Sequence, residues 1–96
     1  MTALQGLARD YRVAFLRYLP RREEAALHAG YELGRSAVTE GHSILELSQI
    51  HHEVLLDVLR DSRGEDLTRL ANAASEFFLE VLSTFDMAQR GLLEER

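Results

Sequence analysis

Residues 66–93 carry the longest uninterrupted helical pattern of the chain, and this segment limits the possible folds more than any other feature. It contains no proline and one glycine, Gly91. Apolar residues recur along it at helical spacing, in a row made of Leu67, Leu70, Ala74, Phe77, Val81 and Ala88. At about 1.5 Å per residue such a helix is roughly 40 Å long. The segment therefore predicts one helix that is long for a chain of 96 residues.

A second row of apolar residues lies beside the first on the same helix. It consists of Ala71, Phe78, Leu82, Phe85 and Leu92. The combined stripe is wider than one packed neighbour requires, so we expect other helices or a partner subunit to cover the surplus. Because no helix stop precedes Arg96, we also expect the chain to be a fragment of a larger protein.

The amino-terminal half predicts two helices that meet at a proline. Apolar residues at i, i+3 and i+4 spacing predict the first helix over residues 2–19, with an inward stripe of Leu4, Leu7, Tyr11, Ala14, Phe15 and Tyr18. Pro20 ends this helix, and because proline is favoured at the first position of a helix, we expect it also to start the second. The second helix extends to Thr39, with Gly41 as its carboxy-terminal cap.

The third helix has a clearly marked start. Ser43 and Glu46 have the Ser-x-x-Glu spacing of a capping box, and the helix that they open reaches Asp61. Its inward residues are Leu47, Ile50, Val54 and Val58. Since no segment alternates apolar and polar residues, four amphipathic helices with short connections predict an all-α, antiparallel four-helix bundle formed by residues 1–96 as one domain.

Composition excludes several classes of protein. The chain has no cysteine, which rules out a disulfide framework, a zinc-thiolate site and a thiol nucleophile. No apolar run approaches the roughly 20 residues of a membrane span, and no signal peptide is recognisable. We expect a cytoplasmic protein without membrane contact.

The net charge of −5 conceals an asymmetry along the chain. Residues 1–22 carry five arginines and one acid, Asp10, whereas residues 23–96 carry six arginines and fifteen acids. An anionic partner could bind the basic first helix. Because no aromatic residues are interleaved with the arginines in a nucleic-acid motif, we expect no nucleic-acid partner.

Small residues repeat every four positions on the second helix, at Ala26, Gly30 and Gly34. A glycine inside a helix destabilises it by about 1 kcal/mol relative to alanine, which favours a position where another backbone approaches closely. That backbone belongs either to the same bundle or to a second subunit, and the sequence leaves both possibilities open.

The residues that could carry chemistry are few. His28 and Glu32 are spaced as one ligand pair, but a metal site requires three or more ligands, and no Glu-x-x-His motif of di-iron bundles is present. No serine lies in a nucleophile elbow, and no phosphate-binding loop occurs. His51 lies on the inward stripe, where we expect a half-buried ring with a hydrogen-bonded nitrogen; a pH-sensitive or partner-facing role is the alternative. We expect no metal, no cofactor and no catalytic residues.

Three stretches together resemble one known family: residues 30–35 (GYELGR), residues 44–53 (ILELSQIHHE), and residues 77–91 with FDMAQRG at their end. They are similar to the amino-terminal domain of RsbU-type phosphoserine phosphatases of bacterial stress signalling, and a similar bundle occurs in the carboxy-terminal domain of the clock protein KaiA. The resemblance implies a dimeric, non-catalytic four-helix bundle. It also implies a separate metal-dependent serine/threonine phosphatase domain in the parent protein, and an activating switch kinase of the RsbT type as partner.

The leading hypothesis is therefore a regulatory input domain that forms a homodimer and binds a protein partner. The residues predicted for the dimer or partner contact are Gly30, Gly34, Phe78, Leu82 and Phe85. Two alternatives remain: the input domain of a sensor kinase, and a free-standing helical bundle that binds a small ligand or a metal.

Overall fold

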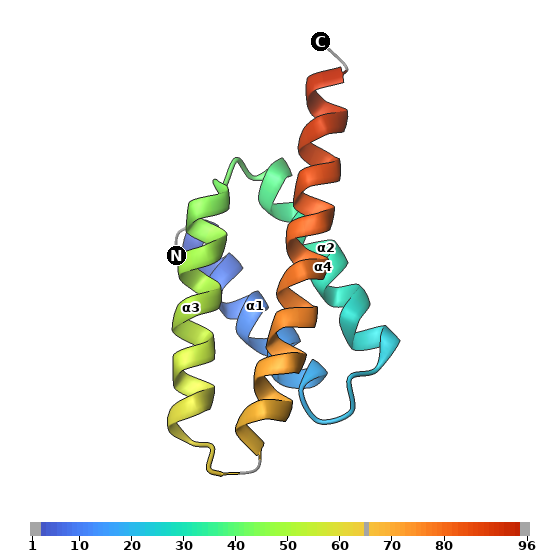
Figure 1. Cartoon of the computed structure of the whole chain (residues 1–96). Helices are drawn as coiled ribbons and strands as arrows, with labels where there is room; N and C mark the ends of the chain where they lie inside the picture. The colour runs from blue at the N-terminus through green and yellow to red at the C-terminus, as the bar shows by residue number, and fades with distance from the viewer. Residues whose placement is uncertain (1–2, 65, 95–96) are drawn as a thin grey trace.

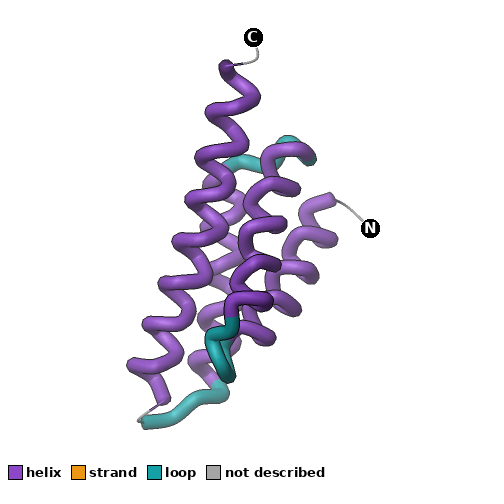
Figure 2. The backbone as a smooth tube through the Cα atoms, turned by 90° about the vertical axis from the view of Figure 1, so that its right-hand side faces the viewer, coloured by secondary structure: helices purple, strands orange, loops and turns teal. Residues whose placement is uncertain are grey.

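Four α-helices build the part of the chain that the computed structural model describes, residues 3–64 and 66–94. They are α1 (Ala3–Tyr18), α2 (Glu24–Thr39), α3 (Ile44–Arg60) and α4 (Asp66–Glu94). Successive helices run in alternate directions (Figure 1), and α4 continues beyond the other three at its carboxy-terminal end (Figure 2). The described residues contain no strand, which confirms the predicted all-α four-helix bundle.

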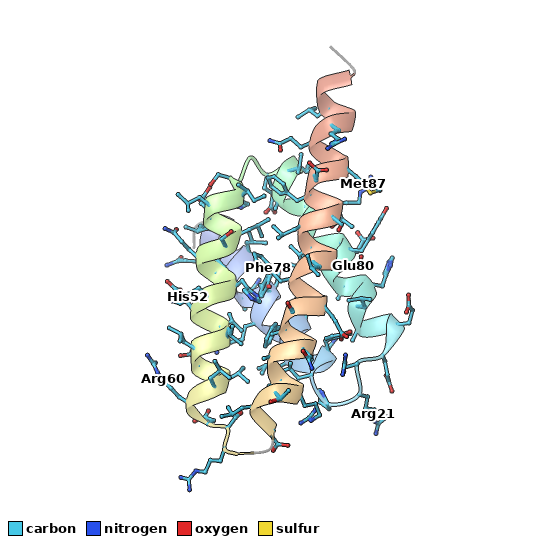
Figure 3. The ribbon with its side chains drawn as sticks, in the orientation of Figure 1. Arg21, His52, Arg60, Phe78, Glu80 and Met87 are labelled. Atoms are coloured by element: carbon cyan, nitrogen blue, oxygen red, sulfur yellow. The ribbon has the colours of Figure 1, made fainter. Side chains whose placement is uncertain are left out.

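The connection between α1 and α2 differs from the prediction. Pro20 does not start α2, because the helix begins at Glu24 and the proline lies in an exposed loop. Arg22 has a left-handed backbone with φ of +53°, and its N–H donates to the carbonyl of Tyr18 at 2.8 Å. A left-handed residue cannot belong to a right-handed helix, so the loop extends through residue 23. In this loop Arg21 points away from the bundle (Figure 3).

The connection between α2 and α3 agrees with the prediction. Gly41 has φ of +79°, and the N–H groups of Gly41 and His42 donate to carbonyls in the last turn of α2 at 3.1 and 2.8 Å. This is a Schellman cap, in which glycine accepts the left-handed conformation without strain. The capping box is also present: the N–H of Glu46 donates to Ser43 Oγ at 3.1 Å, and the N–H of Ser43 donates to Glu46 Oε1 at 2.8 Å.

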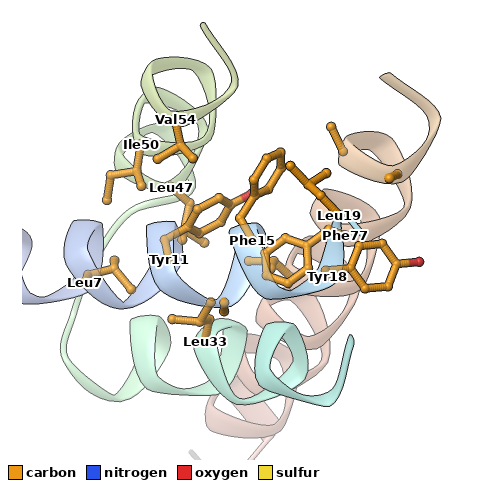
Figure 4. Packing of buried hydrophobic residues seen from close by; sticks show 14 of the residues in the cluster. Leu7, Tyr11, Phe15, Tyr18, Leu19, Leu33, Leu47, Ile50, Val54 and Phe77 are labelled. Atoms are coloured by element: carbon orange, nitrogen blue, oxygen red, sulfur yellow. The ribbon is translucent and has the colours of Figure 1, made fainter. Parts of the chain in front are cut away.

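Aromatic rings fill the centre of the core (Figure 4). Tyr11 and Phe15 from α1 meet Phe77 from α4, and all three side chains are fully buried. Phe77 lies edge-to-face with both, at centroid distances of 5.3 and 5.7 Å. Such pairs contribute about 0.5–1.5 kcal/mol beyond the apolar area that they bury. The amino-terminal helix is thereby fixed to the middle of the long helix.

The most extensive contact between helices joins α2 to α4. Gly30 and Gly34 are buried there. A Cβ atom built on Gly34 would lie 1.9 Å from Thr84 Oγ1 and 2.4 Å from the carbonyl oxygen of Val81. The absence of a side chain at Gly34 is what lets the two backbones come this close. The close approach that the small-residue repeat predicts therefore occurs within the chain.

The length of α4 makes the molecule elongated, with extents of 49 × 28 × 19 Å. Its carboxy-terminal end reaches past the other helices (Figure 2), and Met87 and Leu92 in its last turns are 63% and 50% exposed. None of the described helices is long and apolar enough to span a bilayer.

Candidate functional site

Apolar side chains about one helical turn or less from the contact between His51 of α3 and Phe78 of α4 keep exposed surface, and we name them the α3–α4 face. It comprises Leu55 of α3 with Phe78, Leu79 and Leu82 of α4. Leu79 is 60% exposed, and the other three are partly exposed. Figure 3 shows Phe78 between the two helices. Because α4 leans against α2 and contacts α3 much less, the side chains of this face are only half covered.

His51 of α3 lies partly buried next to Phe78 of the α3–α4 face. Its ring stacks on that of Phe78, with centroids 4.0 Å apart and ring planes 4° from parallel. On the other side, the hydroxyl of Tyr11 and Nδ1 of His51 share a hydrogen bond of 2.6 Å. The predicted half-buried histidine with a hydrogen-bonded ring nitrogen is confirmed.

The electrostatics of this pair favour uncharged groups. Burial, with a smaller contribution from the charge on His52, lowers the pKa of His51 to about 4. Burial also raises the pKa of the Tyr11 hydroxyl. Both side chains are therefore neutral at neutral pH, and their hydrogen bond joins α1 to α3 without burying a charge. A histidine held in this way supports packing rather than proton transfer.

The five residues predicted for a subunit or partner contact divide into two groups. Gly30, Gly34 and Phe85 are buried inside the chain's own bundle. Phe78 and Leu82 keep exposed surface on the α3–α4 face. An interface between subunits is thus a proposal that depends on Phe78 and Leu82, whereas the other three residues pack the protomer.

Several residues of the predicted inward stripes are exposed instead. Leu4, Leu67 and Leu92 are each at least 40% exposed, and Ala71 is also exposed. These residues lie towards the ends of α1 and α4, where fewer side chains of other helices reach them. Helical periodicity predicts which side of a helix is apolar, but it does not predict how far along the helix its neighbours extend.

A second surface is a groove of about 570 Å³ between the end of α2 and the last turns of α4. Its walls include Tyr31, Arg35 and Val38 from α2, and Met87, Ala88 and Gly91 from α4. We name it the α2–α4 groove. The apolar periodicity does not predict this groove, although the small residues Ala88 and Gly91, spaced by three positions on one helix face, are a signal for a gap.

Arg35 is the charged residue of the α2–α4 groove. Its guanidinium donates to the hydroxyl of Tyr31 at 3.1 Å and lies 5.8 Å from the centre of that ring. The ring of His28 stacks on that of Tyr31, with centroids 5.3 Å apart. The ring of Tyr31 thereby holds the guanidinium in place beside the groove.

The histidines do not gather into a metal site within the described residues. His28 Nε2 and Glu32 Oε1 are 3.4 Å apart, and both side chains are mostly exposed. His42 lies near Glu40 and Glu46, but the two carboxylates approach different ring nitrogens, at 3.3 and 3.8 Å. No three histidine or acidic side chains converge on one point in residues 3–64 and 66–94.

Acidic residues of the other helices neutralise part of the basic charge near α1. Arg12 pairs with Asp57 of α3 at 2.5 Å. Arg22 forms two hydrogen bonds to Glu76 of α4, which also accepts one from the hydroxyl of Tyr18. Arg12 thus connects α1 to α3, and Arg22 connects the loop after α1 to α4.

Comparison with protein families gives a match that covers residues 9–88. The matching family is described as phosphoserine phosphatase RsbU, N-terminal domain. No curated protein and no solved structure matches the chain.

Proposed function

The chain belongs to the family of the N-terminal domain of the phosphoserine phosphatase RsbU, and from this membership we propose that it is the regulatory input domain of a bacterial stress-signalling phosphatase. The domain carries no chemistry of its own. The phosphatase domain, the cytoplasmic location and the link to stress signalling are parts of this proposal.

The α3–α4 face is the observation that carries the proposal. Phe78, Leu79 and Leu82 present apolar side chains on one helix, and such clusters on a small domain mark surfaces that bind other proteins. We propose that two copies of the domain meet there. A contact of this kind is isologous, because the same face of each copy takes part.

A dimer offers a means of regulation. If a partner binds one arrangement of the two subunits more tightly than another, it shifts the population towards that arrangement. We propose that the partner is a switch kinase of the RsbT type, as the family implies. The long α4 helix is the element through which a change between subunits would reach other parts of the parent protein.

Calorimetric titration of the domain with the RsbT-type switch kinase of the same bacterium tests the proposal. We expect saturable binding with a Kd in the micromolar range or below, and no hydrolysis of a phosphoserine peptide by the domain alone. A titration without binding would contradict the regulatory assignment, and hydrolysis that persists in purified protein would contradict the non-catalytic one.

A further inference from the structure

We propose that the α2–α4 groove binds an amphipathic helix of the regulatory partner, with apolar side chains of that helix in the groove and one of its carboxylates paired with Arg35. The inference rests on the proposed function, because it assigns the surface at which the partner docks.

The shape of the groove suits a helix. Two helices form its walls, α2 from Tyr31 to Thr39 and α4 from Thr84 to Leu92, and Ala88 and Gly91 leave room between them. The residues that line the groove come from α2 and α4 alone, so it would not enclose a small molecule on most sides, as ligand pockets do. An added helix can place side chains at i, i+3 and i+4 spacing into such a channel. Val38 and Met87 provide apolar contact for them.

Arg35, the charged residue that lines the groove, favours a helix that carries a carboxylate. Within the described residues, no carboxylate lies within ion-pair distance of Arg35; its hydrogen bond goes to the hydroxyl of Tyr31. The charge of Glu32 attracts Arg35 without forming an ion pair with it. Oε1 of Glu32 lies 3.4 Å from Nε2 of His28 instead. A guanidinium that is held by Tyr31 and has no carboxylate partner among the described side chains favours an incoming carboxylate, because less side-chain entropy is lost on binding.

The groove and the α3–α4 face lie on different sides of α4. Phe78 points towards α3, whereas Met87 lies on the side above α2 (Figure 3). Partner and second subunit would therefore use different sides of α4. A second copy in the groove would instead join two different surfaces, and such a contact makes open chains of molecules unless the rotation between copies closes.

Gly91 allows the groove to be filled without disturbing the fold. A Cβ atom at Gly91 meets no atom within 4 Å, so the side chain of Gly91→Leu would occupy the groove. Gly6→Leu is the matched control, since Gly6 also lies in a helix and a Cβ atom there would also meet nothing within 4 Å. Thermal unfolding should show that both variants are at least as stable as the wild type.

Charge reversal tests the ion pair. Arg35→Glu places a negative charge at the groove, and Arg63→Glu makes the same change in the turn between α3 and α4, at the opposite end of the bundle (Figure 1). Arg35→Lys keeps the charge but loses the bidentate geometry of a guanidinium. We expect binding by Arg35→Lys to lie between that of the wild type and that of Arg35→Glu.

The measurement is calorimetric titration of each variant with the RsbT-type switch kinase, together with sedimentation of each variant alone. Gly91→Leu and Arg35→Glu should raise Kd at least about tenfold, and Gly6→Leu and Arg63→Glu should stay within about twofold of the wild type. If the wild type binds and the groove variants bind equally well, the inference is overturned while the proposed function stands.

Two other outcomes would also overturn the inference. If Gly91→Leu converts a dimer into a monomer, the groove holds a second copy and not the partner. If the wild-type domain does not bind the kinase at all, the proposed function fails, and the assignment of a docking groove fails with it.

Discussion

The ring of His51 connects three helices of the bundle. It shares a hydrogen bond with Tyr11 of α1, stacks on Phe78 of α4 and belongs to α3. The spacing of apolar residues on the third helix predicts that this histidine faces inward. Tyr11 lies forty positions earlier in the chain, and no local pattern indicates which residue of another helix will meet the ring, because that depends on how the helices pack.

We predict that His51 makes the stability of the domain depend on pH. Burial lowers the pKa of His51 from 6.5 to about 4 in the folded state, so between these values the unfolded chain binds the proton more readily. The part of the free energy of unfolding that depends on a neutral His51 is fully present above about pH 6.5, and it is lost as the pH falls towards 4. It amounts to about 1–2 kcal/mol, less than the full shift would give, because the ring is partly exposed.

Urea denaturation of the wild type and of His51→Gln between pH 4 and pH 7.5 measures this contribution. The free energy of unfolding should fall more steeply with decreasing pH in the wild type than in the variant. His52→Gln is the control, since His52 is exposed on the same helix. In this variant the free energy of unfolding should depend on pH almost as steeply as in the wild type. Equal slopes for wild type and His51→Gln would contradict the role given to the buried ring.

The packing of α2 against α4 is the main contact at the scale of the elements. A Cβ atom built on Gly30 would lie 3.2–3.4 Å from the side chains of Phe77 and Val81. A Cβ atom built on Gly34 would instead overlap the side chain of Thr84 and the backbone of α4. A side chain can move by a few tenths of an ångström more easily than a helix backbone can. The two glycines should therefore differ greatly in their tolerance of alanine.

We predict that Gly34→Ala destabilises the domain by about 3 kcal/mol or more, because α2 and α4 must separate. Gly30→Ala should change stability by less than about 1 kcal/mol, since the gain in helix propensity offsets a mild overlap. Gly6→Ala should stabilise by about 0.5–1 kcal/mol, because its Cβ meets nothing. Chemical denaturation of the three variants checks the order, and equal effects at Gly34 and Gly30 would refute the close approach.

The start of α3 gives a second prediction at this scale. Ser43→Ala removes the side chain that accepts the N–H of Glu46, and we expect a loss of about 1 kcal/mol in the free energy of unfolding. Ser48→Ala is the control within the same helix. The Ser48 hydroxyl donates to the Ile44 carbonyl, a bond that adds little to a formed helix, so the change should stay within about 0.5 kcal/mol. A loss as large at Ser48 as at Ser43 would contradict the capping role.

Helix ends were predictable where a local motif determines them and not elsewhere. The capping box of Ser43 and Glu46 and the left-handed Gly41 act through neighbouring backbone groups, so the sequence contains all the information required. The start of α2 depends on the left-handed Arg22, whose side chain is bound to Glu76 on α4. A contact across 54 positions has no local signature, and the proline alone led to the wrong boundary.

At the scale of the whole molecule, the wide apolar stripe of α4 serves more than one purpose. Part of it is buried against α2 and α1, Phe78 and Leu82 remain on the α3–α4 face, and the last turns form one wall of the α2–α4 groove. The sequence predicts that the stripe is too wide for one neighbour. Which residues are covered depends on the crossing of α2 and α4, and therefore only the structure separates the core from the two exposed surfaces.

Sedimentation velocity at micromolar concentration tests the central claim, that the α3–α4 face joins two subunits. We predict a dimer for the wild type, with twice the mass of the 10.9 kDa chain. Leu82→Glu should give a monomer with unchanged helix content. Val13→Glu, an exposed apolar position on α1, should remain a dimer. A wild type that is monomeric at every concentration, or a Leu82→Glu variant that still dimerises, would contradict the account.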